Sequence, residues 1–125
     1  MRYVDGFVIV VTKKKLPLYR KMAALGGKIW KKHGALEYFE CIGDDLQPKG
    51  MGTETMLTFP KMTKMKPSET VVFSFIVFQS RKHRDQVNAK VMKDPAMSPE
   101  AWKDKPMPFD MKRMAYGGFK AIVDA

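Results

Sequence analysis

Two stretches of the chain, residues 7–11 and 71–78, are apolar at almost every position. Such runs are typical of strands that are buried on both faces of a sheet. Successive side chains of a strand point to opposite faces, so both faces of this sheet would carry apolar side chains. Both faces therefore need a cover.

Two segments have the three- and four-residue spacing of apolar positions that predicts an amphipathic helix. The first covers 17–33 and contains a Gly26-Gly27 pair, which we expect to permit a close approach to the sheet or a local kink. The second covers 81–93, with Ser80 as its N-cap and with Val87 and Val91 facing inward.

The remaining periodicity predicts strands at 3–12, 36–43, 70–79 and 112–123, with a short extra strand or strand extension at 53–59 and a basic loop over 60–67. The order βαββαβ indicates a single α+β domain spanning 1–125, with a ferredoxin-like antiparallel sheet and both helices on one face. The other face is left uncovered. We expect a second copy of the chain to cover it, with Phe73 and Phe75 at the dimer interface.

The composition, 45% hydrophobic over 125 residues, allows a normal core. The longest apolar run is much shorter than the roughly 20 residues of a membrane-spanning helix. The apolar run after Asp5 is too short for the core of a signal peptide. We therefore expect a cytoplasmic protein that has no membrane partner.

The net charge of +10 is uneven, because eight Lys and Arg residues and no acidic residue lie between Asp5 and Glu37. A basic helix face that is simply solvated explains this, and so does a surface that binds phosphates. The run Phe73-Ser74-Phe75 partly matches the base-stacking signature of the RNA recognition motif, whose strand order is the same. An RNA- or anion-binding module is therefore the alternative hypothesis, and it uses the surface that the dimer would bury.

Charged and phenolic residues embedded in the apolar strands are the candidate pocket residues, since such groups either pair with one another or line a cavity. The structural alternative is a simple pairing, for example of Asp5 with Arg113. The two histidines have no metal-ligand spacing and no phosphate-binding or nucleophile motif occurs, so no metal, cofactor or catalytic residue is predicted. The candidate pocket residues are Asp5, Tyr38, Glu40, Arg113 and Tyr116.

Several segments distributed over nearly the whole chain resemble the YbaA-like family of small bacterial proteins of unknown function. The most specific are the start, Tyr3-Val4-Asp5-Gly6-Phe7, and the segment near the end, Phe109-Asp110-Met111-Lys112-Arg113-Met114-Ala115-Tyr116-Gly117-Gly118-Phe119. The resemblance implies a dimeric α+β barrel, in which two ferredoxin-like sheets face each other. In the wider superfamily the site is usually in a cleft between sheet and helices. The superfamily includes several unrelated enzymes, and membership does not choose among them.

These observations predict a homodimeric α+β barrel that binds a small molecule in a cleft between sheet and helices. Whether the protein is an enzyme is left open by the sequence.

Overall fold

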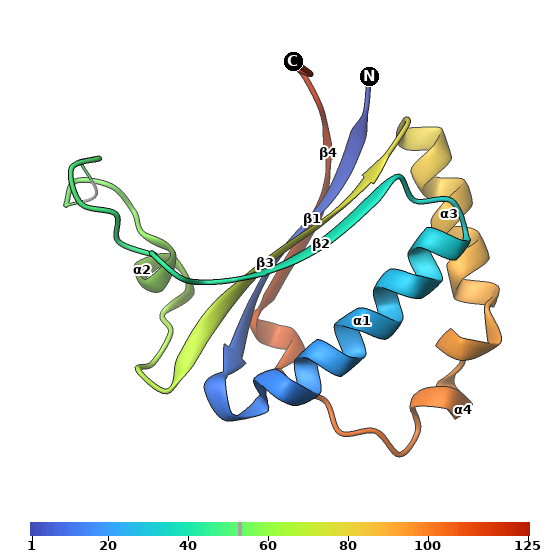
Figure 1. Ribbon diagram of the computed structural model, residues 1–125, viewed down its shortest axis with the longest axis horizontal. Coiled ribbons are helices and arrows are strands. Elements are labelled where there is room, and N and C mark those ends of the chain that lie inside the picture. Colours follow the sequence, from blue (N-terminus) through green and yellow to red (C-terminus); the bar gives the residue numbers. More distant parts are fainter. Residues whose placement is uncertain (53) are drawn as a thin grey trace.

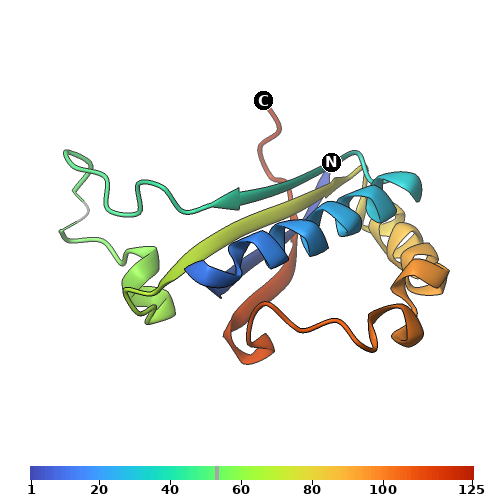
Figure 2. The same cartoon turned by 60° about the horizontal axis from the view of Figure 1, so that its bottom comes forward.

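The computed structural model describes residues 1–52 and 54–125. One antiparallel sheet forms the centre of the molecule, with the strand order β2-β3-β1-β4. The strands are β1 (Tyr3–Thr12), β2 (Glu37–Ile42), β3 (Glu69–Phe78) and β4 (Met114–Lys120). The two long helices, α1 (Leu16–Lys32) and α3 (Arg81–Lys93), lie on the same side of this sheet (Figures 1 and 2). The predicted ferredoxin-like α+β fold is therefore confirmed.

Shorter elements occupy the connections. Among the described residues, 3₁₀ turns at Lys13–Lys15, Pro95–Met97 and Met111–Arg113 respectively precede α1, follow α3 and precede β4. The remaining short helices are α2 (Phe59–Thr63) and α4 (Pro99–Trp102).

The alternation of side chains along the central strands matches the expected pattern. On β3, Val72, Ile76 and Phe78 face the helices and are almost fully buried. Their neighbours Phe73 and Phe75 face the other side. The core between sheet and helices has two parts, one around Phe78, Ile29 and Val91 and one around Val11, Tyr19 and Ala23.

The boundaries of both long helices follow local signals. Pro17 stands in the first turn of α1, where the missing N–H costs nothing. The Ser80 hydroxyl accepts a hydrogen bond from the His83 N–H at 3.0 Å, which confirms the predicted N-cap of α3. Val87 and Val91 are buried on the inner face of α3, as predicted.

The predicted strand over 53–59 is wrong for its described part. Residues 54–58 form turns and extended chain, and Phe59 begins α2; residue 53 lies outside the described residues. The Thr58 hydroxyl caps α2 and Pro60 stands in its first turn, so this segment starts a helix. Most of α2 falls within the range 60–67, which was predicted to be a loop. The fourth strand is also shorter than predicted, because the Met111–Arg113 turn precedes it.

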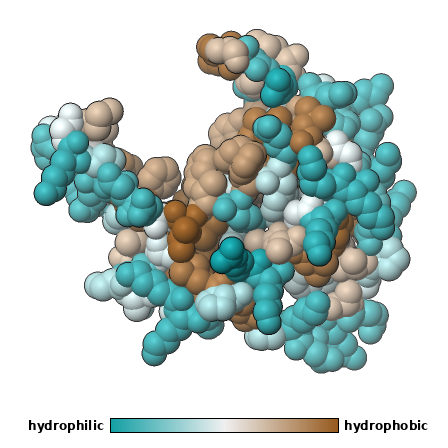
Figure 3. Space-filling model, viewed as in Figure 1, coloured by the Kyte–Doolittle hydropathy of each residue, from teal (hydrophilic) through white to brown (hydrophobic). Residues whose placement is uncertain are grey.

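The face of the sheet opposite the helices is only partly covered. The connection that carries α2 packs against β3, and Val10 and Val71 are buried on this face. Further along, Phe39, Phe73 and Phe119 are about half exposed, at 48%, 46% and 61%. In Figure 3 hydrophobic atoms gather in a band along the strands, between hydrophilic surfaces. A large apolar surface therefore remains open on the single chain.

A polar clasp joins the ends of the two long helices. Asp94, which is buried just after α3, accepts a hydrogen bond from the Ala96 N–H at 2.9 Å and from Lys32 Nζ at 3.2 Å. His33 Nε2 lies 2.7 Å from the same carboxylate. The backbone N–H of Ala96, together with His33 and Lys32, lowers the pKa of Asp94 to about 2.

We predict that this clasp makes stability depend on pH in the acid range. An aspartate has a pKa of about 3.9 in an unfolded chain, so the contribution of Asp94 is fully present above about pH 4 and is lost as the pH falls towards 2. The urea concentration at the midpoint of unfolding should decrease as the pH is lowered from 5 to 2 for the natural protein, and it should decrease less steeply for Asp94→Asn. Asp45→Asn, at an exposed position, is the control. Equal slopes for Asp94→Asn and the natural protein would contradict the clasp.

Candidate functional site

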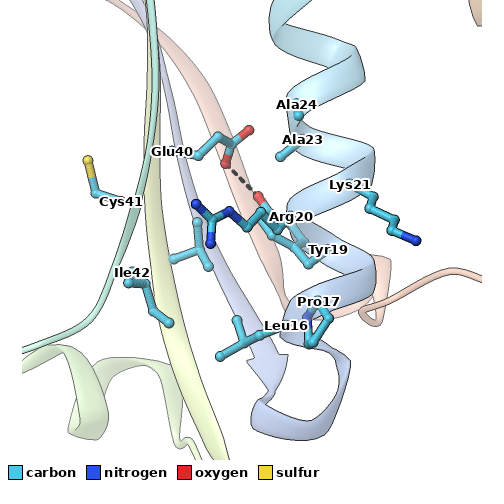
Figure 4. A pocket seen from close by; sticks show the side chains of 11 residues that line it. Leu16, Pro17, Tyr19, Arg20, Lys21, Ala23, Ala24, Glu40, Cys41 and Ile42 are labelled. Atoms are coloured by element: carbon cyan, nitrogen blue, oxygen red, sulfur yellow. Dashed lines mark hydrogen bonds between the residues drawn. The ribbon is translucent and has the colours of Figure 1, made fainter.

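A cleft with a volume of about 970 Å³ lies between α1 and the edge strand β2. Its walls are mainly apolar, and they come from the first half of α1 and from the end of β2 (Figure 4). The side chains that line it include Leu16, Tyr19, Arg20, Ala24, Glu40 and Ile42.

A carboxylate held by two phenols lies in this cleft. The Tyr19 hydroxyl donates to one oxygen of Glu40 at 2.6 Å, and the Tyr38 hydroxyl donates to the other oxygen at 2.6 Å. Burial is the largest cause that raises the pKa of both tyrosines above the usual value, and the hydrogen bond and charge of Glu40 raise it further. Both phenols therefore stay protonated, and they hold the carboxylate in one position.

Close packing of Tyr38 on the helix explains how these groups meet. A Cβ added to Gly26 would lie 3.0 Å from the Tyr38 hydroxyl, and one added to Gly27 would lie 3.0 Å from its ring. Both distances are shorter than an ordinary van der Waals contact. The glycine pair therefore gives the Tyr38 ring the room it needs against α1, which is the close approach that the sequence predicted.

Two basic residues of α1 lie at the same cleft. Arg20 and Lys21 line it, and in Figure 4 the guanidinium of Arg20 extends from the helix towards β2. No hydrogen bond or ion pair joins the side chain of Arg20 to another described residue. Cys41 stands next to Glu40, but its side chain points to the opposite side of β2 (Figure 4).

The structure brings Tyr38 and Glu40 together but places the other three candidate residues elsewhere. Asp5 faces α3 and is 1% exposed, and its carboxylate lies 3.3 Å from Arg84 Nε in an ion pair. Burial raises the pKa of Asp5, whereas the Asn88 amide and the charge of Arg84 act in the opposite direction. The Tyr116 hydroxyl also interacts with Asp5, and the Tyr116 ring stacks on Phe7 with a centroid distance of 4.7 Å.

The expected pairing of Asp5 with Arg113 is wrong. Arg113 donates to Glu69 at 2.5 Å and to the backbone carbonyls of Thr63 and Lys64 at 3.3 Å, so it ties the start of β4 to the end of α2. The reason is the strand register, because Asp5 lies opposite Gly118 and Arg113 comes before the strand begins.

Sequence reasoning missed Tyr19 and Arg20 as residues of the cleft. Tyr19 lies on the buried stripe of α1, and the need of a buried phenol for a hydrogen-bond partner is the signal that could have identified it. Arg20 follows it directly and is exposed. No local pattern distinguishes Arg20 from the other basic residues of α1.

Two further features are absent from the described residues. No group of three or more His, Cys, Asp and Glu side chains is arranged to hold a metal ion. No helix is long and apolar enough to cross a membrane.

Comparison with known proteins identifies relatives over the whole chain. The chain is 44% identical over 124 residues to the uncharacterized protein YbaA of Escherichia coli K12, and to YbaA of Shigella flexneri, covering 99% of each chain. Among solved structures it is similar to a dimeric ferredoxin-like protein from an uncultured marine organism, with a TM-score of 0.58, 10% identity and complete coverage of both chains. That likeness shows the fold. The model of a family of proteins of unknown function, DUF1428, matches residues 2–111, and the chain therefore belongs to this family.

Proposed function

We propose that the protein is a homodimer that binds a small molecule in the cleft between α1 and β2. The cleft volume of about 970 Å³ is at the upper end of the range of roughly 300–1,000 Å³ that is usual for ligand pockets. Its walls are apolar apart from a few polar groups, of which Glu40 is held in place by two hydrogen bonds. Apolar walls with a small number of positioned polar groups are the usual form of a small-molecule site.

The open apolar face supports the homodimer. Phe39 and Phe73 each pack against Phe75, with centroid distances of 5.1 Å and 5.8 Å, and Phe39 and Phe73 remain about half exposed. Each such side chain contributes roughly 1.5–3 kcal/mol when it becomes fully buried. The relative of known structure is described as dimeric, which agrees with a second copy as the cover. Two sheets that pack face to face in this way would form the predicted α+β barrel.

The two parts of the proposal are compatible in space. The cleft lies between β2 and α1, on the helix side of the sheet (Figure 4). The half-exposed rings of Phe39 and Phe73 lie on the opposite side. A dimer formed through that face leaves the cleft of each subunit accessible to a ligand. Each subunit would therefore carry its own site.

The alternative is a module that binds RNA or another polyanion. The basic residues of α1 and of the turn before it are exposed, which agrees with this hypothesis. Base stacking on Phe73 and Phe75 would require that these rings stay free, whereas the dimer buries them. The oligomeric state therefore separates the two hypotheses for this surface.

We predict that Phe73→Asp weakens the dimer by roughly a hundredfold or more. An aspartate at the centre of an apolar interface has no partner, and an uncompensated buried charge costs about 3–5 kcal/mol. Sedimentation equilibrium over a range of concentrations measures the dissociation constant. Met92→Asp, at an exposed position on α3, should leave the dimer unchanged. A monomeric natural protein would contradict the homodimer and would favour the stacking surface.

We also predict that Ala24→Trp blocks the cleft. Ala24 lines the cleft, and a tryptophan there would fill part of it. Binding of the fluorescent apolar anion 8-anilinonaphthalene-1-sulfonate should weaken at least tenfold, and a small molecule seen by native mass spectrometry on the natural protein should be absent. Ala89→Trp, at an exposed position on α3, is the matched control.

Two results would contradict this proposal. The first is a natural protein that carries no small molecule and does not bind the dye. The second is an equal loss of dye binding in Ala24→Trp and in Ala89→Trp. Sedimentation of Ala24→Trp should still show a dimer, because the substitution lies on the helix side.

A further inference from the structure

The polar groups of the cleft have opposite charges, and this narrows the chemistry of the ligand. Glu40 accepts one hydrogen bond on each oxygen, from Tyr19 and from Tyr38. A carboxylate has about four acceptor positions, so roughly two are left for a ligand. Arg20 is an exposed cation at the same cleft, and its side chain has no hydrogen bond or ion pair within the described chain.

The two charges do not neutralise each other directly. No ion pair joins Arg20 to Glu40 among the described residues, although both side chains reach into the same space (Figure 4). A molecule in the cleft can therefore meet a fixed anion and a free cation together. The surrounding apolar side chains, including Leu16, Ile42 and Val72, would contact the remainder of that molecule.

We propose that the cleft binds an α-amino acid with an apolar or aromatic side chain. Its ammonium group donates to Glu40, its carboxylate accepts from Arg20, and its side chain lies on the apolar wall. This inference rests on the proposed function of the cleft and specifies its ligand class.

Other ligand classes match the charges less well. A simple amine is repelled by Arg20 and by the net charge of +10. A simple acid is attracted by that charge but meets the Glu40 carboxylate inside the cleft. A neutral apolar molecule offers no hydrogen-bond partner to the free acceptor positions of Glu40 or to the Arg20 guanidinium, so it gains nothing from either charge. A zwitterion with adjacent ammonium and carboxylate groups satisfies both.

The phenols make Glu40 an effective partner for an ammonium group. Because both hydroxyls donate to the carboxylate, its orientation is set before the ligand arrives, and less conformational freedom is lost on binding. A phenol is protonated at neutral pH, and the raised pKa values of Tyr19 and Tyr38 keep these donors protonated in alkaline solution as well.

Three compounds with the same aromatic side chain test the proposal by isothermal titration calorimetry. L-Phenylalanine carries both charges, phenethylamine carries only the ammonium group, and 3-phenylpropanoate carries only the carboxylate. The natural protein should bind L-phenylalanine at least tenfold more tightly than either of the others, because a hydrogen bond to a charged group contributes a factor of about 10 to 100.

Two substitutions assign the charges to their partners. Glu40→Gln should weaken the binding of L-phenylalanine and of phenethylamine about tenfold or more, and it should not weaken the binding of 3-phenylpropanoate. Arg20→Met should weaken the binding of L-phenylalanine and of 3-phenylpropanoate, and it should not weaken the binding of phenethylamine. Arg81→Met, at an exposed position on α3, is the control and should change none of the three.

The outcomes separate this inference from the proposed function. Equal affinity for the three compounds, or equal losses for all three in either variant, would overturn the amino-acid proposal. The same holds if L-phenylalanine does not bind at millimolar concentrations while the fluorescent dye binds and Ala24→Trp blocks it; the cleft would then remain a ligand site of another class. The comparison on the natural protein does not depend on whether a variant folds.

Discussion

The pairing of β1 with β3 is the constraint on which the rest of the structure depends. The two strands pair over ten positions, from Tyr3 opposite Phe78 to Thr12 opposite Glu69, and they form the centre of the sheet. Because both strands are largely apolar, burial is required on both faces. The helices can supply it on only one face, since α1 and α3 both follow crossovers to the same side. The open aromatic face and the helix-side cleft are two results of this one arrangement.

A buried ion pair within this apolar layer fixes the position of α3. Asp5 points towards the helices and forms an ion pair with Arg84. The guanidinium packs so closely on β4 that a side chain at Gly118 would clash with both Arg84 and the Tyr3 hydroxyl. Arg84 donates to the Tyr3 hydroxyl at 3.0 Å and lies over its ring. Removing a charge from water is costly, so a lone Asp5 or Arg84 here would be strongly destabilising. The pair therefore permits one placement of the helix on the sheet.

Much of this fold could be predicted from the sequence, because periodicity reports which side chains need burial. The apolar runs of β1 and β3, the stripe of α1 and the Ser80 cap are local signals, and each was interpreted correctly. The partner of Asp5 was predicted wrongly because it depends on register, which a short strand such as β4 does not encode in its own pattern. Arg84 lies three and seven residues before Val87 and Val91, so its inward position could have been deduced from helix spacing.

The candidate site shows the same division between local and long-range information. Tyr38 and Glu40 are two residues apart on one strand, and side chains with this spacing share a face, so their proximity follows from the sequence. Their meeting with Tyr19 requires α1 to lie across β2, which only the packed structure supplies.

The glycine pair in α1 connects this packing to the chemistry of the cleft. A glycine costs about 1 kcal/mol relative to alanine within a helix, so two adjacent glycines weaken α1. In return the Tyr38 ring packs directly on the helix, and its hydroxyl reaches Glu40 from the strand while Tyr19 reaches it from the helix. The Glu40 carboxylate is hydrogen-bonded to a residue of the helix and to a residue of the strand, so its position depends on the packing of α1 against β2. The local loss of helix stability thus supports a fixed anion in an apolar cleft, which is what selective binding of a charged group requires.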